Sequence, residues 1–318
     1  MTVHRLQRVL CSLLCCLATG CLYAQTQLVF NPHWTAQAQF AGYYVAEANG
    51  FYRDAGLQVK IEHSTAGSTL LERVKRGENV LVSLQLTSAM KLIDEGCQLV
   101  NVLQYFQRNS QLVVAHKPLT GVKSLNGMRI GHFRNGSSEL LFAMARQYAL
   151  QVECVPFLSN TNLFVSGAID ATLAMSYNEL HQLKLAGQRI SSQQILRMED
   201  IGYDVPEDGL YVNADYYRSH KAEVDRFAEA TRKGWEWAAA HPDDALEIVM
   251  VYIKQNGVAS NRIVQRCMLK ECIQLLSEKK TGRRSYQLSQ EGVERANRIL
   301  TANGIIRTPV TYQQITKP

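Results

Sequence analysis

The stretch Leu57-Gln58-Val59-Lys60-Ile61-Glu62 alternates apolar and polar side chains, which predicts a β-strand with one buried face. A helix is predicted before it at residues 39–48, closed by Asn49-Gly50, and another after it at residues 69–75. Residues 80–84 then form a continuous apolar run, as expected for a strand buried on both faces. This alternation of strands and helices favours an α/β fold.

A second series of strands and helices follows the first. The first series ends with strands predicted at residues 99–103 and 112–115, and residues 118–126 have the composition of a crossover. The segment Leu210-Tyr211-Val212 is predicted to be a strand that returns to the first series. Beyond Ala214 nearly every segment has a helical pattern, so helices are expected to cover the C-terminal part.

This organisation predicts a two-lobed clamshell with a helical C-terminal wrap. The first lobe is discontinuous and consists of residues 26–116 plus 213–318, and the second lobe consists of residues 117–212. A length of 318 residues exceeds that of one ordinary core and agrees with two lobes. Two α/β lobes joined by two crossings suit a protein that closes on a small ligand by hinge motion.

The N-terminal residues 1–24 have the pattern of a secretory signal peptide. Arg5 and Arg8 precede a short apolar run at residues 9–18, which is too short to span a bilayer. Cleavage after Ala24 gives a protein without an anchor, whereas cleavage before Cys21 resembles lipoprotein processing with Cys21 lipidated. We therefore expect export to the periplasm or to the membrane surface, with membrane contact only through such a lipid anchor.

Composition argues against several classes of partner. The formal charge of +6 is modest and includes the arginines of the leader, so we expect no nucleic-acid partner. The cysteines beyond the leader are widely scattered, and none has a metal-ligand spacing with another cysteine or a histidine. We expect no metal site, and we expect buried free thiols rather than a disulfide. These cysteines are Cys97, Cys154, Cys267 and Cys272.

Aromatic residues gather just after the first predicted strand. Trp34 follows that strand, where α/β sheets present ligands at the carboxyl ends of strands, and an aromatic side chain there can stack on a planar ring. Tyr43 is a further candidate for the same role. The alternative for Phe40, Tyr43 and Tyr44 is that they are packing residues of the first helix.

A second candidate segment, Tyr177-Asn178-Glu179, follows the strand predicted at residues 168–174. Asn178 and Glu179 are expected to leave the end of that strand facing the cleft. An acid beside an amide suits an aminopyrimidine, whose amino group donates hydrogen bonds and whose ring nitrogens accept them. The alternative is that Asn178 caps the next helix and Glu179 lies in its first turn.

A third candidate is Gly136-Ser137-Ser138, at the start of a predicted helix. Its free amides and hydroxyls are suited to an anion or an amide oxygen, although such caps are also common without any ligand. The small-residue loop at residues 64–68 is a similar segment on the opposite lobe. No pattern of a nucleophile with a base, of paired carboxylates or of a metal site stands out, so no catalytic residue is predicted.

In combination, these segments resemble the thiamine-pyrimidine family of type II periplasmic binding proteins, over about residues 27–240. Its members include formylaminopyrimidine-binding proteins of ABC importers and the fungal thiamine pyrimidine synthase. The resemblance implies that Trp34 and Tyr43 stack on a pyrimidine and that Glu179 binds it, with Tyr177 and Asn178 nearby. The segments that carry it are Trp34, Gln39-Phe40-Ala41-Gly42-Tyr43-Tyr44-Val45-Ala46, Gly50-Phe51-Tyr52, Tyr177-Asn178-Glu179 and Pro206-Glu207-Asp208-Gly209-Leu210-Tyr211-Val212.

The same resemblance leaves two functions open. One is an extracytoplasmic binding protein that captures a thiamine-precursor pyrimidine for an ABC importer or a membrane sensor and needs no cofactor. The other is a synthase that makes hydroxymethylpyrimidine phosphate from its own histidine and pyridoxal phosphate, with iron. The synthase has a lysine and a histidine in the segment matching residues 80–90, and a tight cysteine cluster; this chain has neither. We therefore favour binding, while the exact ligand stays open because related clamshells bind sulfonates and riboflavin precursors.

Overall fold

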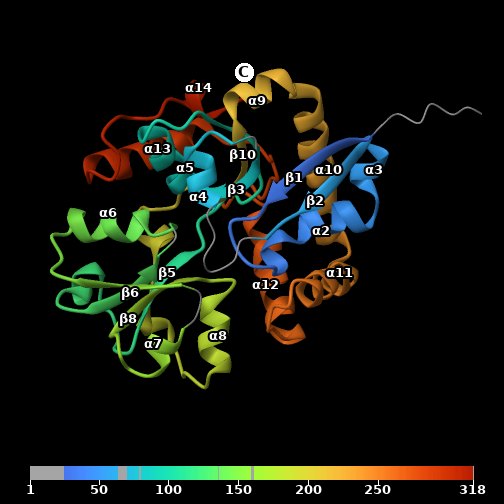
Figure 1. Cartoon of the computed structure of the whole chain (residues 1–318). Coiled ribbons are helices and arrows are strands. Elements are labelled where there is room, and N and C mark those ends of the chain that lie inside the picture. The colour runs from blue at the N-terminus through green and yellow to red at the C-terminus, as the bar shows by residue number, and fades with distance from the viewer. Residues whose placement is uncertain (1–24, 64–69, 79, 135, 159–160, 318) are drawn as a thin grey trace, which may run out of the picture.

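The computed structural model describes residues 25–63, 70–78, 80–134, 136–158 and 161–317. The predicted signal peptide with Cys21 and the loop at residues 64–68 lie outside the described residues. Within the described part of the chain, no helix is long and apolar enough to cross a membrane. The fold is α/β and has two lobes, each with its own sheet (Figure 1), as the sequence predicts.

The first sheet has five strands in the order β2-β1-β3-β10-β4. β1 is parallel to β2 and β3, whereas β10 is antiparallel to both of its neighbours. The alternating segment that opens the sequence pattern forms β2, paired in register with β1 from Thr26↔Leu57 to Phe30↔Ile61. The strands are β1 (Thr26–Asn31), β2 (Leu57–Ile61), β3 (Leu81–Gln85), β4 (Leu99–Gln104) and β10 (Asp208–Asn213).

The second sheet repeats this plan with the order β7-β6-β8-β5-β9. β6 is parallel to β7 and β8, and β5 is antiparallel to β8 and β9. In each sheet the antiparallel strand is the one that enters it from the other sheet. The strands are β5 (Gln111–Ala115), β6 (Arg129–Phe133), β7 (Glu153–Phe157), β8 (Ala171–Met175) and β9 (Ile195–Arg197).

The assignment of residues 112–115 to the first lobe is wrong. They lie in β5, which pairs with β8 and β9 in the second sheet. The first crossing is therefore residues 105–110, and the second is residues 198–207. The second crossing leads into β10 of the first sheet, which contains the return strand predicted at Leu210-Tyr211-Val212, so the predicted end of the second lobe at residue 212 is also wrong. Sequence pattern alone shows that a segment is a strand but not which sheet it joins, because both sheets offer similar apolar neighbours.

The two crossings run side by side and are bonded to each other. The backbone N–H of Phe106 donates to the Asp208 carbonyl (3.0 Å), and that of Glu207 donates to the Phe106 carbonyl (3.1 Å). The buried Glu207 carboxyl group also accepts hydrogen bonds from the backbone N–H (2.6 Å) and the hydroxyl (2.7 Å) of Ser110. Both connections between the lobes are thus held at one place.

Helices cover the outer faces of both sheets, and the C-terminal ones reach across to the second lobe (Figure 1). Helix α12 packs against α8, and α13 packs against α6, which confirms the predicted C-terminal wrap. The helices of the first half are α2 (Ala41–Ala48), α3 (Phe51–Asp54), α4 (Leu70–Lys75), α5 (Leu86–Asp94), α6 (Glu139–Gln147), α7 (Asn162–Val165) and α8 (Glu179–Leu185). Those that follow are α9 (Ala214–Ser219), α10 (Lys221–Ala240), α11 (Pro242–Gln255), α12 (Arg262–Leu275), α13 (Gln290–Ala302) and α14 (Tyr312–Ile315).

Helix α2 is held against the first sheet by a close contact with α10. A Cβ atom added at Gly234 would collide with the Gly42 carbonyl oxygen, and one added at Gly42 would collide with the Trp235 ring. The absence of side chains at both glycines therefore lets the two helix backbones approach closely. This contact also positions the chain just before α2, where Gln37 and Gln39 lie.

We expect Gly234→Ala to destabilise the first lobe, because its methyl group would force α2 and α10 apart. Overpacking of this kind typically costs about 1–3 kcal/mol. Urea unfolding of the protein without ligand measures the change, and Lys233→Ala, an exposed position on the same helix, is the control. An unchanged free energy of unfolding in Gly234→Ala would show that the two helices are not tightly packed.

Candidate functional site

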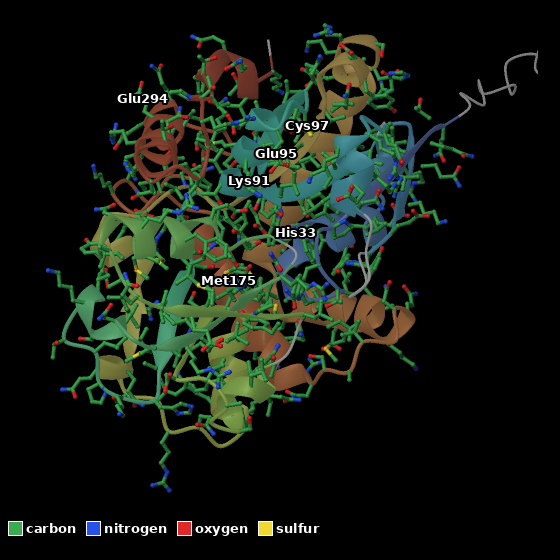
Figure 2. The ribbon with its side chains drawn as sticks, turned by 60° about the vertical axis from the view of Figure 1, so that its left-hand side comes forward. His33, Lys91, Glu95, Cys97, Met175 and Glu294 are labelled. Atoms are coloured by element: carbon green, nitrogen blue, oxygen red, sulfur yellow. The ribbon has the colours of Figure 1, made fainter. Side chains whose placement is uncertain are left out.

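A pocket lies between the two lobes, with an empty volume of about 290 Å³ including its open mouth. Figure 2 shows His33 of the first lobe and Met175 of the second, which both line it. The walls combine aromatic rings with amides and one carboxyl group. The residues are His33, Trp34, Gln37, Gln39, Gln85, Phe133, Ser137, Met175, Tyr177, Asn178 and Glu179, and we call this set the central pocket.

Trp34 is half-buried and lies just after β1, as the sequence predicts. The partly buried His63 holds its loop. The Nδ1 atom of His63 bonds the Trp34 carbonyl oxygen (2.9 Å), and its Nε2 atom bonds the Tyr44 hydroxyl (2.8 Å). Burial lowers the pKa of His63 to about 4, so the ring is neutral near pH 7. A neutral ring with Nδ1 as donor and Nε2 as acceptor satisfies both bonds.

His33 forms the base of the first-lobe wall, and its imidazole is 14 % exposed. Its Nδ1 atom lies 2.8 Å from the Ser83 hydroxyl, and its Nε2 atom lies 4.0 Å from a carboxyl oxygen of Asp208. Burial lowers the pKa of His33, although the nearby Asp208 acts in the opposite direction. Gln39 donates to the other Asp208 oxygen (2.6 Å), so Asp208 supports the wall from behind.

The second-lobe wall is built from the end of β8 and the start of α8. Glu179 is the first residue of α8 and is 2 % exposed, with one carboxyl oxygen accepting from the Met175 backbone N–H (2.9 Å). The other oxygen accepts from the Asn178 side-chain amide (2.7 Å). Burial raises the pKa of Glu179 to about 7, although these hydrogen bonds oppose the shift. Glu179 is therefore in the helix's first turn and in the pocket wall at once.

The two walls touch each other across the pocket. The Trp34 and Phe133 rings meet edge to face, with centroids 5.7 Å apart. Gln111 of the second sheet donates to the side-chain carbonyl of Gln85 in the first (2.8 Å). These contacts join the two lobes directly beside the pocket.

The Gly136-Ser137-Ser138 segment contributes only in part. Ser137 lines the central pocket, and its carbonyl accepts from the Gln111 side chain (3.2 Å). Ser138 is buried behind it and donates its hydroxyl to the Phe133 carbonyl (3.1 Å). Gly136 and Ser138 are not among the lining residues, so we correct the prediction for these two positions.

Tyr43 also lies away from the central pocket, which corrects its predicted place in the cleft. It is fully buried on the sheet-facing side of α2, where its ring stacks on Phe30 of β1 with centroids 4.0 Å apart. Its other face meets the edge of Tyr105 (5.7 Å). The helical period turns residue 43 toward the sheet. Tyr43 is therefore a packing residue of the first helix, which is the alternative given above.

Sequence reasoning missed six of the lining residues. Gln85 and Phe133 end β3 and β6, so a search for side chains at the carboxyl ends of all parallel strands would have found them. Met175, the last residue of β8, has the same signal. His33, Gln37 and Gln39 follow β1 without any pattern that separates them from their neighbours.

The described residues contain no cluster of three or more histidine, cysteine or acidic side chains suited to a metal ion. Cys97, Cys154, Cys267 and Cys272 are free thiols, as expected, but only Cys272 is fully buried.

Comparison with known families decides the class of the chain. The profile of the family described as "NMT1/THI5 like" matches residues 37–245, which is more than half of the chain and includes most of the central pocket. The chain belongs to the NMT1/THI5-like family. This agrees with the resemblance found in the sequence at the level of the family, whereas the match names no ligand.

Individual relatives are distant. The riboflavin-binding protein RibY of Chloroflexus aurantiacus is 22% identical over 303 residues, covering 91% of this chain and 84% of that protein. The ligand-binding component of an ABC-type import system from Staphylococcus aureus has a TM-score of 0.68 at 12% identity, covering 92% and 97% of the two chains. The periplasmic aliphatic sulphonate-binding protein SsuA from Escherichia coli has a TM-score of 0.63 at 15% identity, covering 92% of each. At these identities the two structures establish the two-lobed fold, not a ligand.

The buried Glu179 gives a testable pH dependence. Its pKa is about 7 in the folded protein against an ordinary value of 4.5, so it stabilises the fold below about pH 4.5 and this stabilisation is lost as the pH rises through 7. Glu179→Gln lacks this titrating group. The decrease in its free energy of unfolding between pH 5 and pH 8 should therefore be about 3 kcal/mol smaller than that of the unmodified protein. Urea unfolding of both proteins at the two pH values measures this difference. Equal pH dependence in the two proteins would contradict the shifted pKa.

Proposed function

We propose that this protein is an exported solute-binding protein that captures a small planar nitrogen heterocycle, of the thiamine-related pyrimidine type, for an ABC importer or a membrane sensor. The observation that supports this proposal most is that both lobes contribute lining residues to one pocket. Trp34 from the first lobe and Asn178 and Glu179 from the second line the same pocket. Closure around a ring thus completes the site from both lobes.

The chemistry of the walls suits an aromatic ring with an amino group. The Trp34 and Phe133 rings offer faces and edges for stacking. Asn178 and Glu179 offer an amide and a carboxyl group at the opposite side, which match the donors and acceptors on the edge of an aminopyrimidine.

Export and delivery follow from the same proposal. The leader at residues 1–24 would direct the chain out of the cytoplasm, with Cys21 as the alternative site of a lipid anchor. A closed, loaded clamshell then presents a surface that a permease or sensor can distinguish from the open form. Mass spectrometry of the mature N-terminus separates cleavage after Ala24 from lipidation of Cys21, and an intact Met1 would refute export.

The alternative function is that of a thiamine pyrimidine synthase, and the lining residues of the central pocket do not favour it. The described lining residues of the central pocket include no lysine or arginine, so they do not fit the aldehyde and phosphate of pyridoxal phosphate. Lys91, the first lysine after β3, is 48% exposed and pairs with Glu95 (3.2 Å). Neither Lys91 nor Glu95 is among the lining residues of the central pocket.

Native mass spectrometry of freshly purified protein tests the two functions directly. A bound mass equal to a pyrimidine of the thiamine pathway supports capture, and a bound mass equal to riboflavin would replace the proposed ligand while keeping the binding role. Pyridoxal phosphate retained by the protein, with release of a pyrimidine phosphate, would overturn the proposal in favour of the synthase.

Two substitutions test the proposed roles of the opposite walls. Trp34→Ala removes a stacking surface worth about 1–3 kcal/mol, and Glu179→Gln weakens a hydrogen bond to a charged group worth about 1.5–3 kcal/mol. Each should reduce the affinity for 4-amino-5-hydroxymethyl-2-methylpyrimidine by about tenfold to a hundredfold in calorimetric titration.

The control is Trp237→Ala, which removes an indole that stacks on His241 of α10's C-terminal end instead of lining the pocket. Its affinity should match that of the unmodified protein. If both pocket variants fold normally and bind as tightly as the control, the ligand site is elsewhere.

A further inference from the structure

The N-terminal ends of α5 and α6 meet across the two lobes, and a carboxyl group lies between them. Glu139, the first residue of α6, is 6 % exposed. One of its carboxyl oxygens accepts a hydrogen bond from the Thr87 hydroxyl (3.2 Å), and the other accepts from the Ser88 hydroxyl (3.1 Å). Both donors are uncharged and belong to the first turn of α5, so they hold the negative charge without neutralising it.

This carboxyl group lies directly behind the wall of the central pocket. Gln85, which immediately precedes α5, and Ser137, which lies two residues before the start of α6, both line that wall. The Ser88 hydroxyl that donates to Glu139 also accepts from the Ser137 backbone N–H (3.3 Å). A chain of two hydrogen bonds therefore connects Glu139 to a residue of the wall.

The first turns of two nine-residue helices would otherwise form a favourable place for an anion. Free backbone N–H groups and the helix dipole attract negative charge at such ends, and the Thr87 and Ser88 hydroxyls add two donors. In this chain the donors are occupied by its own carboxyl group.

We propose that Glu139 determines specificity by excluding solutes that carry a phosphate, sulfonate or carboxylate. The inference rests on the proposed function and deepens it, since it restricts the ligand to uncharged or positively charged heterocycles. The lining residues supply no lysine or arginine to offset a ligand anion, and His33 is neutral when its pKa is lowered by burial. An anionic group beside Ser137 would lie close to the buried Glu139, which is linked to Ser137 through the Ser88 hydroxyl, and like charges in such a buried setting repel strongly.

The test compares two probes that differ by one phosphate group. Calorimetric titration is done with 4-amino-5-hydroxymethyl-2-methylpyrimidine and with its phosphate monoester. We expect the unmodified protein to bind the uncharged probe at least about tenfold more tightly, and Glu139→Gln to reduce that preference by about tenfold. Glu294→Gln is the matched control, because it removes the same charge from an exposed position on α13 that Figure 2 shows away from His33 and Met175. Its preference should be unchanged.

A second measurement separates this inference from the proposed ligand. Glu139→Ala frees the hydroxyls of Thr87 and Ser88, so inorganic phosphate should raise the melting temperature of this variant and not that of the unmodified protein. If phosphate stabilises both proteins equally or neither, or if Glu139→Gln keeps the full preference, Glu139 does not select against anions. Failure of the unmodified protein to bind either pyrimidine would overturn the proposed function instead, and the phosphate result would still decide the role of Glu139.

Discussion

The hydrogen bonds between the Glu207 carboxyl group and Ser110 fix the two lobes relative to each other. Each residue lies on one of the two crossings, so this contact joins both connections between the sheets. The Glu207 backbone carbonyl also accepts from the N–H of Leu86, the first residue of α5, which places Gln85 at the pocket wall. Burial and the neighbouring Asp208 both raise the pKa of Glu207, which favours its uncharged form. Burying an uncharged carboxyl group at this junction costs much less free energy than burying a carboxylate.

The central pocket depends on this junction because no single lobe contains it. Its first wall follows β1 and β3, and its second follows β6 and β8, so each wall lies at the carboxyl ends of parallel strands in its own sheet. The repeated strand order of the two sheets makes these ends face each other. Contacts such as Trp34 with Phe133 then depend on how far the crossings let the lobes close.

Local patterns in the sequence predicted the elements well and their partners less well. The period of two at residues 57–62 and the helical pattern of residues 290–302 correspond to β2 and α13, because both signals come from one buried face. The sheet to which β5 belongs depends on long-range pairing, which no local pattern records. Trp34 and residues 177–179 were predicted at the pocket from their positions after strands, and Ser137 from its position at a helix start. Tyr43 was misplaced because a helix position alone does not say which aromatic ring faces the cleft.

The position of β10 in the first sheet has a consequence for the order in which the chain folds. β10 lies between β3 and β4, so until residue 213 has been made this sheet consists of two separate parts. The strands of the second sheet, by contrast, all lie within residues 111–197, so all of them can pair before the rest of the chain is made. During synthesis the second sheet is therefore complete first, while β4 still has no partner strand. Closing the first sheet requires contacts between residues about a hundred positions apart (Tyr211 with Asn101), a pairing that is slow on general grounds. A chain of this topology benefits from any factor that keeps its first hundred residues from aggregating until the last strand arrives.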